Sequence, residues 1–146
     1  FNFLYITDLF YWYFYDLIFI MKIEIKILDI NIICILRDNL TADKIALILP
    51  LKSNINIWGD EIYFPVENIN LELEDDAKDV MELGEIAFWI QGNSIAIGFG
   101  ATPVSVGDEI RLINDANVWA DAVDSKQLLK LKNISQNTQI EISLLN

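Results

Sequence analysis

From Met21 onward, apolar and polar residues alternate along the chain, as they do in β-strands with one buried face. The first alternating run has isoleucine at every second position and charged residues between them. A second apolar run over residues 30–36 follows a turn at Asp29. Two such runs joined by a short turn predict an antiparallel pair of strands.

A short helix is predicted after this pair. Thr41 is expected to cap its N-terminus, and Asp43 suits the first turn because a carboxylate there meets the positive end of the helix dipole. Pro50 ends the helix, since proline cannot continue it. Residues 53–58 and 61–64 then predict two more strands.

The second half of the chain continues in short strands. Residues 85–90 and 94–99 predict a hairpin around Gln91-Gly92-Asn93, with Trp89 on the face opposite the core set. Strands are also predicted over 108–113, 117–123 and 139–144, and a short helix over 125–132. Seven or more short strands with two short helices indicate a mainly β fold, a small closed antiparallel β-barrel.

The tetrapeptide Gly-Asp-Glu-Ile occurs twice, at residues 59–62 and 107–110. Each copy places a glycine, which tolerates positive φ, before a polar pair and a β-branched residue, so each predicts a turn that leads into a strand. Glu61 and Glu109 hold equivalent positions. We expect them to have similar environments without lying close together, which argues against paired-carboxylate glycosidase chemistry.

Acidic side chains crowd one connecting segment, with six between residues 72 and 82. The spacing and the central glycine of an EF-hand calcium loop are missing. The segment is therefore expected to be a solvated acidic connection, and no metal site is predicted.

Composition excludes several classes of function. The chain has 146 residues, the length of one domain, with no histidine, one cysteine and ten basic residues. Catalytic triads with histidine and His-ligated zinc are therefore excluded. Cys34 lies in an apolar run and is predicted to be a buried, inert thiol. No cofactor is predicted.

The chain is strongly acidic. Its formal net charge is −12, which would repel a phosphate backbone, so nucleic acid is not an expected partner. The same charge favours solubility and attracts cationic ligands modestly.

Residues 1–20 differ in composition from the rest, with ten aromatic residues against seven in all that follows. A translated upstream stretch or wrong start, a hydrophobic anchor and an ordered extension are the alternatives. Asp8 and Asp16 oppose a membrane span, because each would cost about 2.5–3.5 kcal/mol near the bilayer centre. We expect this extension to lie outside the native domain, formed by residues 21–146. A cytoplasmic location is then expected, and membrane contact only if the extension is an anchor.

Several blocks in a fixed order carry a family resemblance. They are Trp-Gly-Asp-Glu-Ile-Tyr-Phe at 58–64, Glu-Leu-Gly-Glu-Ile-Ala-Phe-Trp at 82–89, Gly-Asn at 92–93, Phe-Gly-Ala-Thr-Pro at 99–103 and Gly-Asp-Glu-Ile-Arg at 107–111. With these blocks the chain resembles a family of small prokaryotic cyclophilin-like proteins from Met21 to its C-terminus. The resemblance implies a cyclophilin-like β-barrel. It implies little about activity, because the family is largely uncharacterised and fold does not determine function.

Three departures from the family pattern fall where the rim of a pocket is expected. The family tends to have prolines where this chain has Ile90-Gln91, a proline in place of Ala101, and Ser-Pro near Asp115-Ala116. Proline stiffens a loop, so the rim is expected to be looser here than in relatives.

The candidate pocket contains aromatic walls, a donor and neighbouring polar residues. Its members are Tyr63, Trp89, Phe99, Thr102, Arg111 and Glu61. Tyr63 and Trp89 suit a pocket edge because each has a polar group, whereas Phe99 suits either the pocket or the core. Arg111 suits either a donor role or an ion pair with Glu61 or Glu109. The other arginine, Arg37, lies in a turn and is expected to be solvated.

Three functions remain open at this point. The first is a non-catalytic binding module for a small molecule or a peptide segment. The second is a peptidyl-prolyl isomerase, which would need an apolar pocket and a donor to stabilise the twisted amide. The chain lacks the full residue set of true cyclophilins, since it has no histidine. The third is an interaction subunit that docks a partner through exposed apolar surface.

Overall fold

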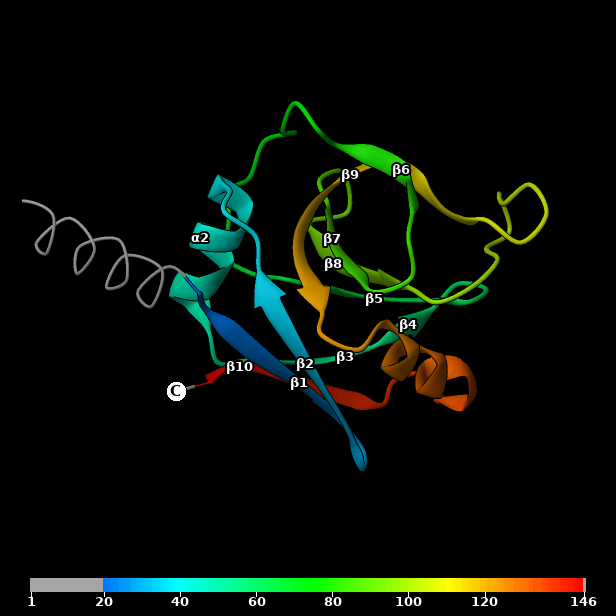
Figure 1. Ribbon diagram of the computed structural model, residues 1–146, viewed down its shortest axis with the longest axis horizontal. Coiled ribbons are helices and arrows are strands. Elements are labelled where there is room, and N and C mark those ends of the chain that lie inside the picture. Colours follow the sequence, from blue (N-terminus) through cyan, green and yellow to red (C-terminus); the bar gives the residue numbers. More distant parts are fainter. Residues whose placement is uncertain (1–19, 146) are drawn as a thin grey trace, which may run out of the picture.

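The computed structural model describes residues 20–145, so the aromatic-rich extension, apart from its last residue, lies outside the described range (Figure 1). The strands are β1 (Lys22–Ile27), β2 (Ile30–Leu36), β3 (Leu51–Asn54), β4 (Asn56–Ile57), β5 (Glu61–Pro65), β6 (Lys78–Met81), β7 (Glu85–Trp89), β8 (Ser94–Gly98), β9 (Ile110–Ala122) and β10 (Gln139–Leu145). The helices are α2 (Leu40–Ile48) and the 3-10 helix η1 (Ser125–Asn133). Neither helix in the described range has the length and apolar character of a membrane span.

The strands form one curled antiparallel sheet. Its order is β3-β10-β1-β2-β9-β7-β8-β5-β4, and β6 pairs with β9 outside this path. The two edge strands, β3 and β4, are separated in the chain by Ile55 alone, so the sheet must curl until its edges meet. The prediction of a small antiparallel β-barrel is therefore confirmed, and the barrel is nearly closed (Figure 1).

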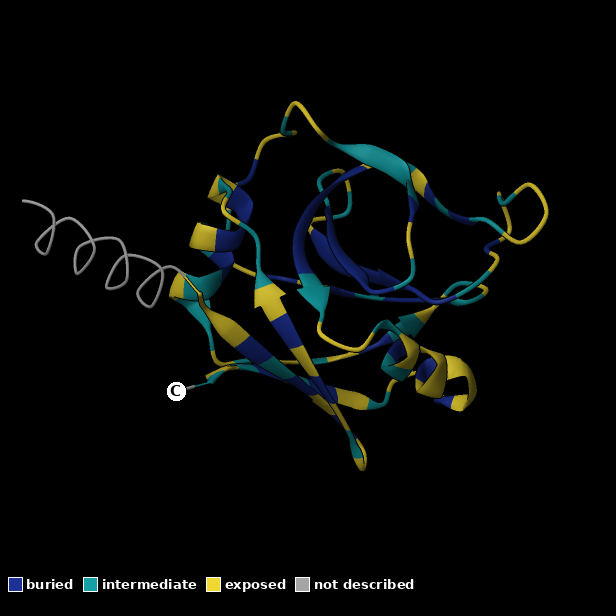
Figure 2. Ribbon diagram, viewed as in Figure 1, coloured by how far each residue is buried: buried dark blue, intermediate teal, exposed yellow. Residues whose placement is uncertain are grey.

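The core fills the inside of the barrel, as the alternation predicted. The isoleucines of β1 at positions 23, 25 and 27 are at most 1% exposed, and they pack with Phe64, Phe88 and Trp119. Buried residues alternate with more exposed ones along β1 and β2 (Figure 2). Cys34 is buried in the same core, and burial raises the pKa of its thiol to about 12. The prediction that this thiol is buried is confirmed, and a thiol with this pKa stays protonated at neutral pH.

The helix cap was predicted two residues too late. The side-chain oxygen of Asn39 accepts a hydrogen bond of 2.8 Å from the backbone N–H of Ala42, so Asn39 caps α2. The Asn39 side-chain amide also donates to the carbonyl of Val118 on β9, at 2.9 Å. Thr41 is instead buried in the first turn, and its hydroxyl donates to the carboxylate of Glu74.

The segment expected to be a solvated acidic connection is partly structured, which corrects the prediction. It contains the strand β6, which pairs with β9. The fully buried side chain of Asn117 on β9 accepts from the backbone N–H of Glu74 at 2.8 Å and donates to the carbonyl of Glu72 at 2.8 Å. Partners on a distant strand, which the local composition does not reveal, therefore order this segment.

A single strand, β9, replaces the two strands predicted over 108–113 and 117–123. It is 13 residues long and serves two pairings. Its C-terminal part pairs with β2 and β7 in the barrel, and its N-terminal part pairs with β6. The strand therefore leaves the barrel wall and continues across the outside of the β7–β8 hairpin (Figure 1).

Small residues on the outer face of the hairpin let β9 approach closely. Ala87 and Ala96 lie in a second apolar cluster with residues of β9. At Gly98, a Cβ atom would lie 2.3 Å from the Cγ2 atom of Ile110, so only glycine leaves room for this isoleucine. Close approach of this kind is a common reason for glycine inside a strand.

We predict that Asn39→Ala lowers the free energy of unfolding by about 1–2 kcal/mol, because it removes both the helix cap and the bond to β9. Urea denaturation measures the change. Asp38→Ala is the control, since Asp38 is exposed, and surface changes of this kind stay within about 0.5 kcal/mol. Equal effects of the two substitutions would contradict the assignment of the cap.

Candidate functional site

A pocket of about 210 Å³ lies on the outer face of the β5–β8–β7 sheet, where β9 crosses it. Its lining residues are Trp58, Glu61, Tyr63, Trp89, Ala96, Leu112 and Ile113. Pockets for drug-sized ligands start at roughly 300 Å³. This one is therefore suited to a small molecule or to a single side chain.

Strand alternation puts these residues on the face opposite the core. In β5, Ile62 and Phe64 point into the barrel, and Glu61 and Tyr63, which alternate with them, point outward. Tyr63 lies directly across from Ala96 of β8. Because alanine is short, space remains beside the Tyr63 ring.

Two aromatic side chains form adjacent walls. The ring centroids of Tyr63 and Trp89 are 6.1 Å apart and the ring planes are perpendicular. The Trp89 indole N–H donates to the side-chain oxygen of Asn114 at 3.0 Å. A Cβ atom at Gly92 would lie 2.0 Å from the Trp89 ring, so this glycine allows the ring to lie against the hairpin turn. The Trp89 wall is therefore held in place by the protein itself.

Glu61 supplies the pocket with a buried carboxyl. The residue is 6% exposed, and within the described residues its Oε1 atom has no hydrogen-bond partner. Burial raises the pKa of the carboxyl from 4.5 to about 7, because the charged form loses its hydration. Glu61 therefore changes its charge near neutral pH.

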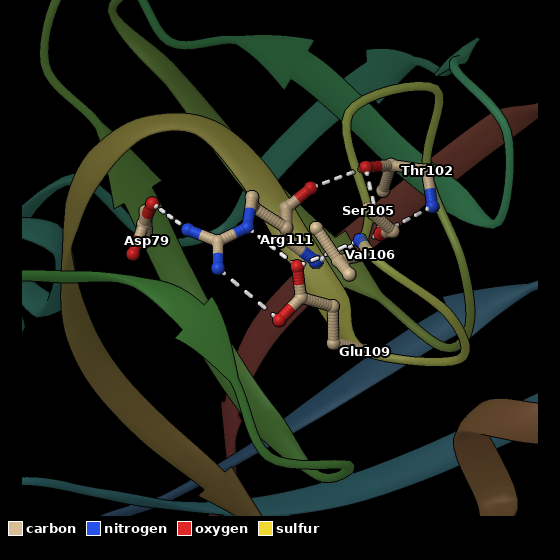
Figure 3. A network of polar contacts seen from close by, with 6 residues as sticks. All are labelled: Asp79, Thr102, Ser105, Val106, Glu109 and Arg111. Carbon is tan, nitrogen blue, oxygen red and sulfur yellow. Dashed lines mark hydrogen bonds and ion pairs between the residues drawn. The ribbon is translucent and has the colours of Figure 1, made fainter.

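The two glutamates of the repeated tetrapeptide have opposite environments, which corrects the expectation that they are similar. Glu109 accepts hydrogen bonds from the Arg111 guanidinium at 2.6 and 3.1 Å and from the backbone N–H of Val106 at 2.8 Å (Figure 3). The bonds from Arg111 are the main cause that lowers the pKa of Glu109. The pKa of Glu61 shifts in the other direction.

The backbone of both copies is as predicted. Gly59 has a φ of +60° and Gly107 a φ of +65°, and each copy leads into a strand. The first copy is also fixed from outside, since the Asp60 N–H donates to the carbonyl of Ala101 at 2.9 Å. A Cβ atom at Gly59 would lie 2.9 Å from the Cα atom of Thr102. Trp58, immediately before this turn, is thereby placed at the pocket.

The predicted site residues divide into two groups. Tyr63, Trp89 and Glu61 line the pocket, and Phe99, Thr102 and Arg111 do not. Phe99 is part of the main core. The remaining two belong to the polar network of Figure 3, in which the Thr102 hydroxyl donates to the carbonyl of Arg111.

Arg111 is held between two carboxylates. Besides Glu109, its guanidinium pairs with Asp79 of β6 (Figure 3). Ser105 completes the network, because its hydroxyl oxygen accepts from the backbone N–H groups of Thr102 at 2.9 Å and Arg111 at 3.2 Å. The arrangement orders the loop before β9 and uses the arginine for that purpose.

The expectation that Arg37 is solvated is wrong. Its guanidinium donates to both carboxylate oxygens of Asp121, at 2.7 and 2.9 Å, and to Glu85 at 2.8 Å. Glu85 also pairs with Lys78 of β6 at 2.7 Å. The partners are 48 and 84 residues away in the chain, so the local sequence around Arg37 did not indicate them.

Sequence reasoning missed four lining residues, Trp58, Ala96, Leu112 and Ile113. Trp58 could have been found, because it is an aromatic residue directly before a turn that leads to two other lining residues. The two alanines of the hairpin, at positions 87 and 96, could have indicated that another strand lies close above them. The contribution of β9 depends on its crossing, and no local signal showed this. Among residues 20–145, no cluster of ligand side chains suited to a metal ion is found.

Comparisons with known proteins agree with this architecture. The model of a sequence family described as Cyclophilin-like matches residues 21–143, a range that contains every lining residue. The solution structure of a hypothetical protein from Archaeoglobus fulgidus is similar, with 35% sequence identity and a TM-score of 0.70 over 86% of this chain and 95% of that one. No curated protein matches the chain at a significant level.

We predict that Glu61→Gln makes the protein more stable than the wild type at pH 8. The raised pKa of Glu61 means that its protonated form favours the fold. The wild type therefore loses stability as the pH rises from 4.5 to about 7, by about 3 kcal/mol in total. Urea denaturation measures the free energy of unfolding of both proteins. The difference between variant and wild type should be about 2 kcal/mol larger at pH 8 than at pH 5.5.

Glu109→Gln is the matched control for this experiment. The pKa of Glu109 is lowered, so its ionised form favours the fold and the variant should gain no stability at pH 8. A constant gap between Glu61→Gln and the wild type across this pH range would contradict the raised pKa of Glu61.

Proposed function

The chain belongs to the cyclophilin-like family, and we propose that it is a non-catalytic binding module whose pocket beside β5 takes a small molecule or a side chain of a peptide segment. The fold by itself assigns no activity, because one fold serves many functions. The proposal therefore rests on the site.

The observation that carries the proposal is the buried Oε1 atom of Glu61, which has no hydrogen-bond partner among the described residues. Buried polar atoms in native proteins are nearly always satisfied, because leaving one unpaired costs about 1–3 kcal/mol. A carboxyl with a pKa raised by burial, on the wall of a concave site, is a characteristic of functional positions. A bound group that donates to Glu61 would remove this cost.

The aromatic walls support the same function. Trp89 is fixed by Asn114 and by its contact with the hairpin turn, and the perpendicular Tyr63 ring meets it. A wall that is ordered before binding loses little side-chain entropy when the ligand arrives. Six of the seven lining residues are aromatic or aliphatic, so a ligand would also bury apolar surface there.

The isomerase alternative receives less support from the arginines. A prolyl isomerase needs a cation or a donor to stabilise the twisted amide, and a guanidinium would suit this role. Arg37 and Arg111, the two arginines of the chain, each pair with two carboxylates. Arg111 is also absent from the pocket lining.

Screening a fragment library by NMR tests the proposal, with the indole N–H signals of the tryptophans as reporters. Amine, amide, alcohol and carboxylic acid fragments are each titrated into the full-length protein. We expect the fragments that bind to shift the signals of Trp58 and Trp89, which line the pocket, and to leave that of Trp119, which is in the core. A library in which no fragment shifts the first two signals would count against the binding function.

Gly92→Ala tests the fixed Trp89 wall without changing a lining residue. The added methyl group would collide with the ring, so the ring must move and fragment binding should weaken. Asn93→Ala in the same turn is not a suitable control, because Asn93 has a positive φ of 45°. Gln91→Ala is suitable, since Gln91 is exposed. Equal fragment affinity of the wild type, Gly92→Ala and Gln91→Ala would show that the position of the Trp89 ring does not contribute to binding.

A further inference from the structure

The carboxylate of Glu61 in the pocket needs a hydrogen-bond donor from the ligand. Glu61 is the one lining residue with a carboxylate, and an ionised carboxylate only accepts hydrogen bonds. The indole N–H of Trp89 is already used, because it donates to Asn114. A ligand that bonds to Oε1 of the ionised Glu61 therefore brings an N–H or O–H group of its own.

The aromatic walls favour a positive charge on that ligand. The faces of Trp and Tyr rings carry negative partial charge and attract ammonium groups. Trp58, Tyr63 and Trp89 line the same small pocket as the carboxylate, and two of these rings are perpendicular, so a compact group would meet aromatic surface on more than one side. A carboxylate beside several aromatic rings is a suitable environment for an ammonium ion.

Anionic ligands are disfavoured on the same evidence. No lysine or arginine lines the pocket. The nearest arginine in the chain to a lining residue, Arg111 beside Leu112, is paired with Glu109 and Asp79. The net charge of −12 adds attraction for cations at longer range.

Given the binding function proposed above, we propose that the pocket recognises an alkylammonium group. The ammonium donates hydrogen bonds to the carboxylate of Glu61. Its positive charge packs against the rings of Trp58, Tyr63 and Trp89. The group belongs either to a small free amine or to a lysine side chain. Both sources present the same chemistry to the pocket, and its volume of about 210 Å³ holds the head and part of the alkyl chain.

A neutral ligand is the competing possibility, and the direction of the pH dependence distinguishes the two. Among the lining residues, Glu61 is the one with a carboxyl group, and burial raises the pKa of that carboxyl to about 7. An ammonium group binds the ionised form of Glu61, so its affinity rises with pH. A carbonyl ligand would bind the protonated form, so its affinity would fall with pH.

The experiment uses n-butylammonium chloride, with 1-butanol as the neutral control, titrated into the full-length protein by NMR at pH 6 and pH 8. We expect butylammonium to bind at the Trp58 and Trp89 signals more tightly than 1-butanol. Its affinity should rise about tenfold from pH 6 to pH 8, because the pKa of Glu61 is about 7 and the amine stays protonated.

Two variants identify the carboxylate. Glu61→Gln should weaken butylammonium binding on the order of thirtyfold or more, because it removes the charged partner. Glu109→Gln changes the equivalent glutamate of the second tetrapeptide, which does not line the pocket, and should leave the affinity unchanged. Circular dichroism confirms that both variants are folded.

A lysine arm of the experiment separates the two sources. N-acetyl-lysine methylamide binding more tightly than butylammonium indicates a peptide ligand, and the reverse order indicates a free amine. Either order supports the proposal.

Three results would overturn the proposal. They are equal binding of butylammonium and 1-butanol, an affinity for butylammonium that falls as the pH rises, and unchanged binding of butylammonium by Glu61→Gln. If other fragments still shift the Trp58 and Trp89 signals in that case, the proposed binding function stands and only the ammonium ligand is wrong. If no fragment shifts them, the binding function and the ammonium ligand are both wrong.

Discussion

The barrel and the pocket both depend on the close packing of β9 against the outer face of the β7–β8 hairpin. One part of β9 completes the barrel beside β2 and β7, and the other part pairs with β6 outside it. This crossing is possible because Ala87, Ala96 and Gly98 extend little or not at all from the hairpin, and Ile110 occupies the space above the glycine. The short side chain of Ala96 also leaves the space that becomes the pocket. The positions that bring the two layers together therefore also create the site.

Most of the barrel could be predicted from local patterns, because alternation reflects which face of a strand is buried. The errors arise where a distant partner decides. Asn39 and Thr41 are both good capping residues, and the additional bond from Asn39 to β9 distinguishes them. Two strands were predicted over 108–113 and 117–123, yet β9 is continuous between them, and its residue Asn114 accepts a hydrogen bond from Trp89. The environment of Arg37 was predicted wrongly for the same reason, since its carboxylate partners lie far along the chain.

The candidate site was only partly predictable. Tyr63 and Trp89 could be identified because they alternate with core residues and are large enough to form walls. Leu112 could not, because its role depends on the crossing of β9. Glu61 and Glu109 show most clearly what a short motif cannot predict. The repeated tetrapeptide predicts the same turn twice. The pKa of each carboxyl depends instead on its surroundings, which are apolar for Glu61 and include the Arg111 guanidinium for Glu109. Backbone conformation is local in this protein and electrostatics is not.

Because β9 is one uninterrupted strand of 13 residues, the pocket wall at Leu112, in the part that pairs with β6, and the barrel pairing at Ala120 lie on the same strand. Contiguous segments of a fold tend to open as one cooperative unit, and their amide protons then exchange with solvent at related rates. The wall of the pocket is then as persistent as the barrel itself. Access to the site depends on side chains at its rim, such as the half-exposed Ile113, rather than on separate unfolding of a lid.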